Sequence, residues 1–161
     1  MKKDAVISEC GLYRPWLLRV WDDTLPRMGF IQLNPSEADA SIDDPTLRRD
    51  MYFARREGFG GVELTNLYDF RAKDPKDLAR AASPVSGACD EHICRMLSRC
   101  AKTVAGYGAH PLAVKREGEL LDMLDARDVL WCLGLTKGGM PRHPLYLRND
   151  TPLQIYATYS E

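Results

Sequence analysis

The chain has 161 residues, of which 45% are hydrophobic and 28% charged, and its formal net charge is −1. These values are ordinary for a globular protein and predict one domain over residues 1–161. The balanced charge excludes a globally basic nucleic-acid-binding protein. No apolar run approaches the roughly 18 residues of a membrane helix, and the first residues, "MKKDAVISEC", do not resemble a signal peptide. A cytoplasmic protein without membrane contact is expected.

Short apolar stretches alternate with amphipathic ones along the chain. Strands are expected over residues 5–8, 15–21, 28–33, 61–67, 103–108 and 129–135. Helices are expected after an N-cap at Asp44 with Pro45 at the first position and Gly58 as C-cap, from about Pro75, from a cap at Ser86 to about Cys100, and over 112–125.

The alternation of strands and helices after residue 28 predicts an α/β fold. The expected architecture is a three-layer α/β/α sandwich around a mainly parallel sheet of about four strands, with the first two strands as an N-terminal hairpin. Ligands of such sheets bind beyond the carboxyl ends of the strands. Polar or glycine-rich residues follow four predicted strands there: Asn34-Pro35-Ser36, Asn66, Gly106-Tyr107-Gly108 and residues 134–143. We therefore expect a pocket at this edge, with Pro35, Ser36, Tyr107 and Gly108 among its ligand-binding residues.

Asn34 and the pair Asp43-Asp44 are candidates for chemistry at this edge. An asparagine amide can orient a water molecule or bind an amide-like edge, although Asn-Pro is also common in simple turns. Two adjacent carboxylates could hold Mg²⁺ or activate water. Asp44 is more simply a helix cap, and the role of Asp43 stays open.

Asn66 could hydrogen-bond a flat heterocycle, with Tyr68 or Phe70 stacking on it and Arg71 holding a phosphate. Asn66 could equally satisfy loop backbone groups. His143 lies between Pro141 and Pro144, which fix its presentation near a mobile glycine pair, so it is a candidate acid or donor.

Basic residues cluster in two segments and are either solvated helix faces or a local phosphate-binding patch. The candidates for phosphate binding are Arg48, Arg49 and Arg142. The five cysteines are expected to be free thiols, since Cys89, His92 and Cys94 have no common zinc spacing. The usual phosphate-loop, dinucleotide, nucleophile-elbow and zinc-protease motifs are absent, so neither a cofactor nor a metal is expected.

The segments "LNPSEADASIDDPTLRRDMYFAR", "GGVELTNLYDFRAKDPKDL" and "CLGLTKGGMPRHPLYL" closely resemble an uncharacterised bacterial and phage family, domain-of-unknown-function family 1643. The resemblance covers roughly residues 10–153. It supplies no activity.

The order of three short motifs also resembles the uracil-DNA glycosylase superfamily, a three-layer α/β fold. These motifs are Asn34-Pro35, Thr65-Asn66 followed by Arg71, and His143-Pro144. The resemblance implies that Asn34 holds the hydrolytic water, Asn66 selects the base and His143 stabilises the departing base. The sequence differs after His143-Pro144, where "LYLRN" replaces the usual serine-rich loop.

The leading hypothesis is metal-independent hydrolysis of an N-glycosidic bond in DNA or a nucleotide, with a nucleobase, nucleotide or nucleic acid as the binding partner. One alternative is a non-catalytic nucleotide or nucleic-acid binding module. The other is metal-dependent phosphate chemistry at Asp43 and Asp44.

Overall fold

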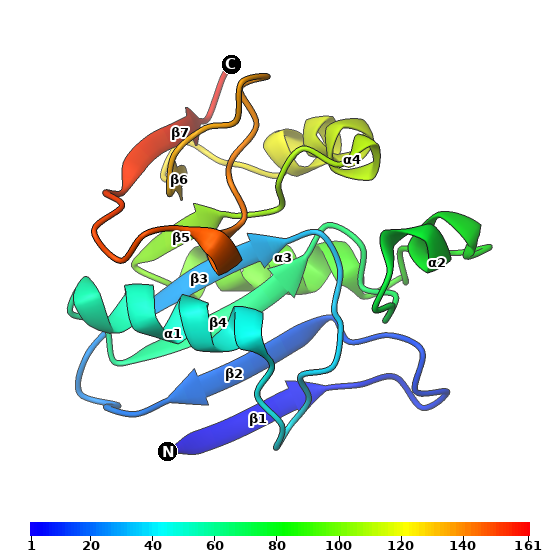
Figure 1. The fold of residues 1–161 in the computed structure, drawn as a ribbon, viewed down its shortest axis with the longest axis horizontal. Helices are drawn as coiled ribbons and strands as arrows, with labels where there is room; N and C mark the ends of the chain where they lie inside the picture. The colour runs from blue at the N-terminus through cyan, green and yellow to red at the C-terminus, as the bar shows by residue number, and fades with distance from the viewer.

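The computed structural model describes residues 1–161, which form a mixed α/β fold with one seven-stranded sheet (Figure 1). The strands are β1 (Lys2–Val6), β2 (Trp16–Val20), β3 (Arg27–Gln32), β4 (Gly61–Asn66), β5 (Lys102–Ala105), β6 (Val129–Cys132) and β7 (Gln154–Thr158). The helices are α1 (Pro45–Arg56), α2 (Pro75–Arg80), α3 (Cys89–Arg99), α4 (Pro111–Asp122) and the short 3₁₀ helix η1 (Pro144–Tyr146). No helix is long and apolar enough to cross a membrane.

The strand order in the sheet is β1-β2-β4-β3-β5-β6-β7. The neighbours β4, β3, β5 and β6 pair in parallel, whereas β1, β2 and β7 pair antiparallel at the two sides. The sheet is larger than the expected sheet of about four strands plus a hairpin. The hairpin strands β1 and β2 belong to the same sheet, and the strand β7 was not predicted. An edge strand such as β7 buries little of its surface, so its sequence lacks the apolar run that marks a central strand.

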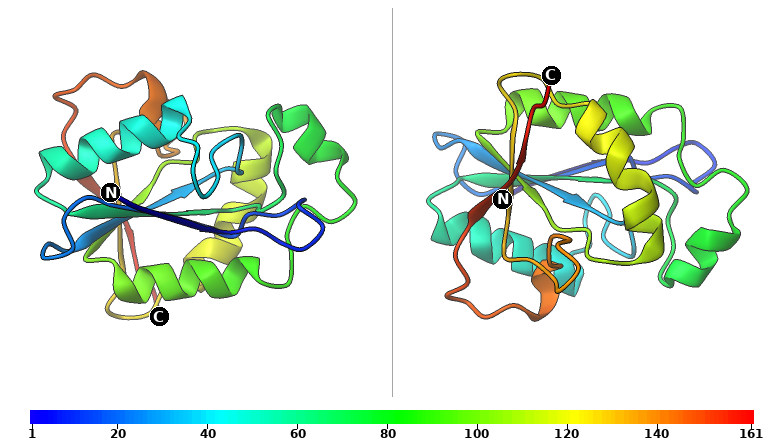
Figure 2. Two further views of the ribbon diagram at one scale, coloured as in Figure 1. Left: turned by 90° about the horizontal axis from the view of Figure 1, so that it is seen from below. Right: turned by 90° about the horizontal axis from the view of Figure 1, so that it is seen from above.

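Helices cover both faces of the sheet, with α1 and η1 on one face and α3 on the other (Figure 2). Helix α4 packs into the same core as α3. Alternate residues of each central strand face opposite sides. Phe30 of β3 accordingly packs in the core beneath α1, and Ile31 in the core beneath α3 and α4.

Local signals fixed the start of one helix correctly and misplaced another. Asp44 caps α1 by accepting a hydrogen bond from the Leu47 backbone N–H at 2.8 Å, and Pro45 is the first helical residue, as expected. The expected Ser86 cap was wrong, because α3 begins after Ala88 without a side-chain cap. Ser86 instead donates through its hydroxyl and its backbone N–H to the Asp69 carboxylate.

A buried arginine holds the connection between β3 and α1, residues 33–44, which we name the β3–α1 loop. Arg19 of β2 is 0% exposed. Its Nε lies 2.7 Å from an Asp43 carboxylate oxygen, and its Nη2 donates to the backbone carbonyls of Asp39 and Ile42. Lys3 of β1 also pairs with Asp43 at 3.2 Å. The hairpin of β1 and β2 therefore orders a loop that has no regular secondary structure.

We expect Arg19→Met to lower the free energy of unfolding by about 3 kcal/mol, because Asp43 and the loop carbonyls lose a buried cationic partner. Urea unfolding measures the loss. The control is Arg48→Met, which removes an exposed side chain with one bond to the Asp43 carbonyl and should change stability by about 0.5 kcal/mol or less. Equal small losses in the two variants would show that Arg19 does not hold the loop.

Candidate functional site

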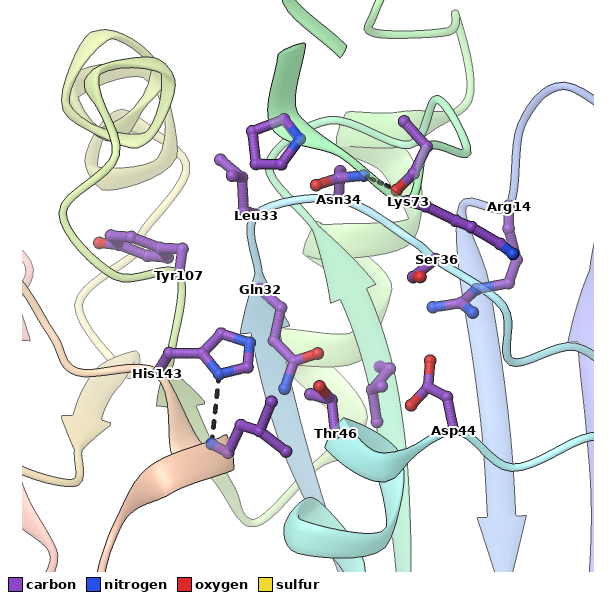
Figure 3. Close-up of a pocket in the computed structure, with 14 residues that line it drawn as sticks. Arg14, Gln32, Leu33, Asn34, Ser36, Asp44, Thr46, Lys73, Tyr107 and His143 are labelled. Atoms are coloured by element: carbon purple, nitrogen blue, oxygen red, sulfur yellow. Dashed lines mark hydrogen bonds between the residues drawn. The ribbon is translucent and has the colours of Figure 1, made fainter. Parts of the chain in front are cut away.

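A cavity of about 280 Å³ lies at the carboxyl ends of the parallel strands, between the β3–α1 loop and η1 (Figure 3). We name it the rim cavity. It is lined by Arg14, Gln32, Leu33, Asn34, Ser36, Asp44, Thr46, Leu64, Ala72, Lys73, Pro75, Tyr107, His143 and Leu145. The structure thus brings together five residues that the sequence singled out, namely Asn34, Ser36, Asp44, Tyr107 and His143.

The amide of Asn34 is held in one orientation. Its Nδ2 donates to the backbone carbonyls of Ala72 at 2.8 Å and Pro35 at 3.1 Å. Both donor hydrogens are occupied in this way, and the amide oxygen accepts no protein hydrogen bond (Figure 3). Asn34 therefore offers the cavity an acceptor that can bind a water molecule or a ligand N–H.

His143 offers the complementary group. Its Nδ1 accepts the backbone N–H of Leu145 at 3.2 Å, which makes His143 the cap of η1. The neutral imidazole must then carry its proton on Nε2, which points into the rim cavity (Figure 3). Burial lowers the pKa of His143, with the Asp44 carboxylate opposing that change. The side chain is thus a neutral N–H donor at pH 7.

Tyr107 forms a wall of the rim cavity rather than a polar contact. Its hydroxyl donates to Glu117 of α4 at 2.5 Å, and Tyr156 of β7 donates to the same carboxylate oxygen. The hydroxyl points away from the cavity in Figure 3. Gly108, at φ +71°, lies beside His143, whose Cβ is 4.0 Å from where a Cβ would stand on the glycine. Gly108 itself does not line the cavity.

A buried amide–carboxyl pair supports the floor of the cavity. Gln32, the last residue of β3, donates from Nε2 to both carboxyl oxygens of Asp50 at 2.9 and 2.7 Å. Asp50 lies on α1 and is 0% exposed. Desolvation raises the pKa of Asp50 well above its ordinary value, although the Gln32 hydrogen bonds oppose this. Since Nε2 is turned toward Asp50, the Gln32 carbonyl oxygen is the group that remains for the cavity.

Three charged side chains also line the rim cavity: Arg14, Asp44 and Lys73. Arg14 is 3% exposed. Both Asp44 oxygens accept backbone N–H groups, from Leu47 at 2.8 Å and from Ala38 at 3.3 Å. Lys73 pairs with Glu37 at 2.6 Å in a mostly exposed contact, which contributes little stability.

Several predicted ligand-binding residues lie outside the rim cavity. Tyr68 donates its hydroxyl to the Leu112 carbonyl, which places it beneath α4 on the other face of the sheet. Pro35 is buried in the loop, where its carbonyl accepts the Ala72 N–H. Asn66 shares the cavity face with Leu64 by strand alternation and pairs in register with Gln32. Asn66 is nevertheless 1% exposed, and neither polar atom of its amide has a hydrogen-bond partner.

The predicted phosphate-binding arginines and Asp43 have structural contacts instead. Arg48 donates to the Asp43 carbonyl, Arg49 to the Leu147 carbonyl and Arg71 to the Gly11 carbonyl. Arg142 is exposed and does not line the cavity. The Asp43 carboxylate is held by Arg19 and Lys3, so only the neighbouring Asp44 reaches the cavity. No three His, Cys, Asp or Glu side chains cluster in a way that could hold a metal ion.

Arg14, Gln32 and Asp50 were not predicted from the sequence. Asp50 interrupts the apolar stripe of α1 formed by Leu47, Met51 and Ala54, and a carboxyl on such a stripe is an unusual buried group. Gln32 similarly ends an apolar strand. These two polar residues at buried positions were the available signals.

We expect the contribution of Asp50 to the free energy of unfolding to fall as pH rises above about 4, the unfolded value for aspartate. Asp50 has a raised folded pKa, so its contribution is fully present below the unfolded pKa and is lost as pH rises through the folded pKa. The slope from this group is at most about 1.4 kcal/mol per pH unit. Asp50→Asn removes the titration, so the stability of the variant relative to wild type should rise with pH.

Denaturant unfolding between pH 4 and pH 8 tests this expectation. Asp122→Asn, at an exposed position at the end of α4, is the matched control. A difference between wild type and Asp50→Asn that stays constant over this range would contradict the expectation.

Comparison with known proteins places the chain in a family. The family model for "Protein of unknown function (DUF1643)" matches residues 14–145. No curated protein and no solved structure matches. The matched segment begins at Arg14 and ends at Leu145, so it contains every residue that lines the rim cavity. The chain belongs to DUF1643, a family of proteins of unknown function.

Proposed function

We propose that this protein hydrolyses an N-glycosidic bond of a nucleobase derivative in the rim cavity, with Asn34 and His143 as the catalytic residues. The observation that carries the proposal is that one cavity contains both a hydrogen-bond acceptor and a hydrogen-bond donor without protein partners. Asn34 supplies an unpaired amide oxygen, and His143 supplies an unpaired Nε2–H. The order of the three short motifs, similar to that of the uracil-DNA glycosylase superfamily and its three-layer fold, supports the same assignment.

The reaction needs a positioned water and a stabilised leaving group. Cleavage of a glycosidic bond develops positive charge on the sugar and negative charge on the departing base. The Asn34 oxygen accepts a hydrogen bond from the water, which attacks the anomeric carbon as the carbon–nitrogen bond breaks. The bonding electrons go to the base nitrogen. His143 donates a hydrogen bond to the departing base as negative charge develops on the base. One proton of the water finally resides on the base.

Recognition of the base is assigned to Gln32 rather than to the expected Asn66. The Gln32 carbonyl oxygen faces the cavity because Asp50 occupies the amide nitrogen. It can therefore accept a hydrogen bond from an N–H on the edge of a base. Because only the oxygen of the Gln32 amide is free, the cavity selects a ligand whose edge carries a hydrogen-bond donor at this position.

We expect Asn34→Ala and His143→Gln each to lower the rate of base release by roughly 100-fold or more, since each removes a group that acts in the transition state. Base release is measured by chromatography with nucleosides, nucleoside monophosphates and uracil-containing single- and double-stranded oligonucleotides. Thermal unfolding of each variant verifies that the fold is intact.

Two residues outside the cavity provide matched controls. His110 also caps a helix through Nδ1, by accepting the Leu112 N–H, so His110→Gln tests the loss of a histidine cap alone. Asn149→Ala tests the loss of an asparagine outside the cavity. Unchanged turnover in Asn34→Ala and His143→Gln would overturn the mechanism. Ligand binding without base release would favour the non-catalytic binding module.

A further inference from the structure

We propose that Arg14 forms an oxoanion-binding subsite in the rim cavity, which takes the terminal phosphate of a small ligand. Arg14 is 3% exposed and lines the cavity beside the β3–α1 loop (Figure 3). The oxoanion site depends only on Arg14 and the residues around it. The identification of the phosphate as that of a nucleotide rests on the proposed function.

The hydrogen bonds of Arg14 leave part of its guanidinium unused. Nη1 donates to the Ala38 backbone carbonyl. Nε is buried and has no hydrogen-bond partner. Nη2 makes no protein hydrogen bond, and no carboxylate forms an ion pair with the side chain, although the Asp44 charge acts on it at longer range. Arg14 is thus a buried cation that lines the cavity, with Nη2 free and Nε left without a partner.

Such a cation is costly to bury without an anionic partner. Desolvation lowers the pKa of Arg14 to about 10, so the side chain still carries its charge at neutral pH. The other buried arginine of this region, Arg19, has an Asp43 partner at 2.7 Å. The contrast between the two side chains indicates that the partner of Arg14 comes from outside the chain.

The surroundings of Arg14 fit a phosphate better than a carboxylate. The hydroxyls of Ser36 and Thr46 line the same cavity and make no protein hydrogen bonds. Lys73 is bound only by an exposed ion pair with Glu37, which can open. A phosphate has enough terminal oxygens for the Arg14, Ser36 and Thr46 donors, whereas a carboxylate has two oxygens. The Asp44 carboxylate opposes an anion, but backbone N–H groups already bind both of its oxygens.

The position of Arg14 also favours a small ligand over a polymer. Arg14 lines a cavity of about 280 Å³, which is near the lower limit of roughly 300 Å³ for small-molecule sites. A terminal phosphate can enter such a space, whereas an internal phosphodiester would have to bring both flanking nucleotides with it. Together with the proposed function, this indicates a nucleoside monophosphate as the ligand.

Isothermal titration of the whole protein tests the subsite with inorganic phosphate, acetate, a nucleoside and its 5′-monophosphate, all at matched ionic strength in chloride. We expect wild type to bind phosphate and to bind the monophosphate more tightly than the nucleoside. Arg14→Met should weaken phosphate binding by roughly 10- to 100-fold, the range for hydrogen bonds to charged groups. Arg95→Met, which removes the same charge from an exposed position on α3 outside the cavity, should leave it unchanged.

Phosphate binding that survives in Arg14→Met, or tighter binding of acetate than of phosphate, would overturn the proposal. If Arg14→Met does not fold, the wild-type comparison decides, because equal affinity for nucleoside and monophosphate also overturns it. These measurements do not depend on turnover. Base release without phosphate binding would contradict the subsite and support the proposed reaction. Phosphate binding through Arg14 without base release would support the subsite and contradict the proposed reaction.

Discussion

The ordering of the β3–α1 loop by buried arginines is the constraint on which the rest of the structure depends. Residues 33–44 leave the sheet after β3 and enter α1 without any helix or strand of their own. Their backbone carbonyls must find donors, because an unpaired buried carbonyl is costly. Arg19 supplies donors to Asp39 and Ile42, and Arg14 supplies one to Ala38. Strand β2 and Arg14, which lies two residues before it, therefore set the path of a loop that is distant in sequence.

The loop in turn places the chemical groups of the rim cavity. Its first part carries Asn34 and Ser36, and its last residue, Asp44, fixes the start of α1. Because α1 begins there, Asp50 lies against Gln32 of β3 and holds its amide. On the opposite side η1 positions His143 through the Leu145 backbone. Parallel strands supply the edge, but an antiparallel hairpin and a short 3₁₀ helix complete the cavity.

The sequence predicted those features that depend on neighbours in the chain. Asp44 and Pro45 form a local helix-start signal, and the prolines around His143 are visible without knowledge of the fold. Asn34 followed from the rule that ligands bind beyond parallel strands. Arg14 could not be placed in this way, because its position depends on the antiparallel pairing of β2 with β4. The contact between Gln32 and Asp50 depends on which face of α1 meets β3. Strand β7 gave no signal, since only its partly buried Tyr156 and Ala157 pack against a core.

The cavity region contains buried polar groups that a protein selected only for stability would avoid. Asp50 is fully buried with a raised pKa, Arg14 lacks an ion pair, and the Asn66 amide has no partner. The buried Glu63 is matched by contrast, since it binds Arg27, Arg99 and Trp16. The contrast argues against general tolerance of buried charge in this chain. Polar groups that oppose folding cluster where proteins bind ligands or carry out chemistry, so the presence of these three groups beside one edge of the sheet is an argument for function that is independent of any motif.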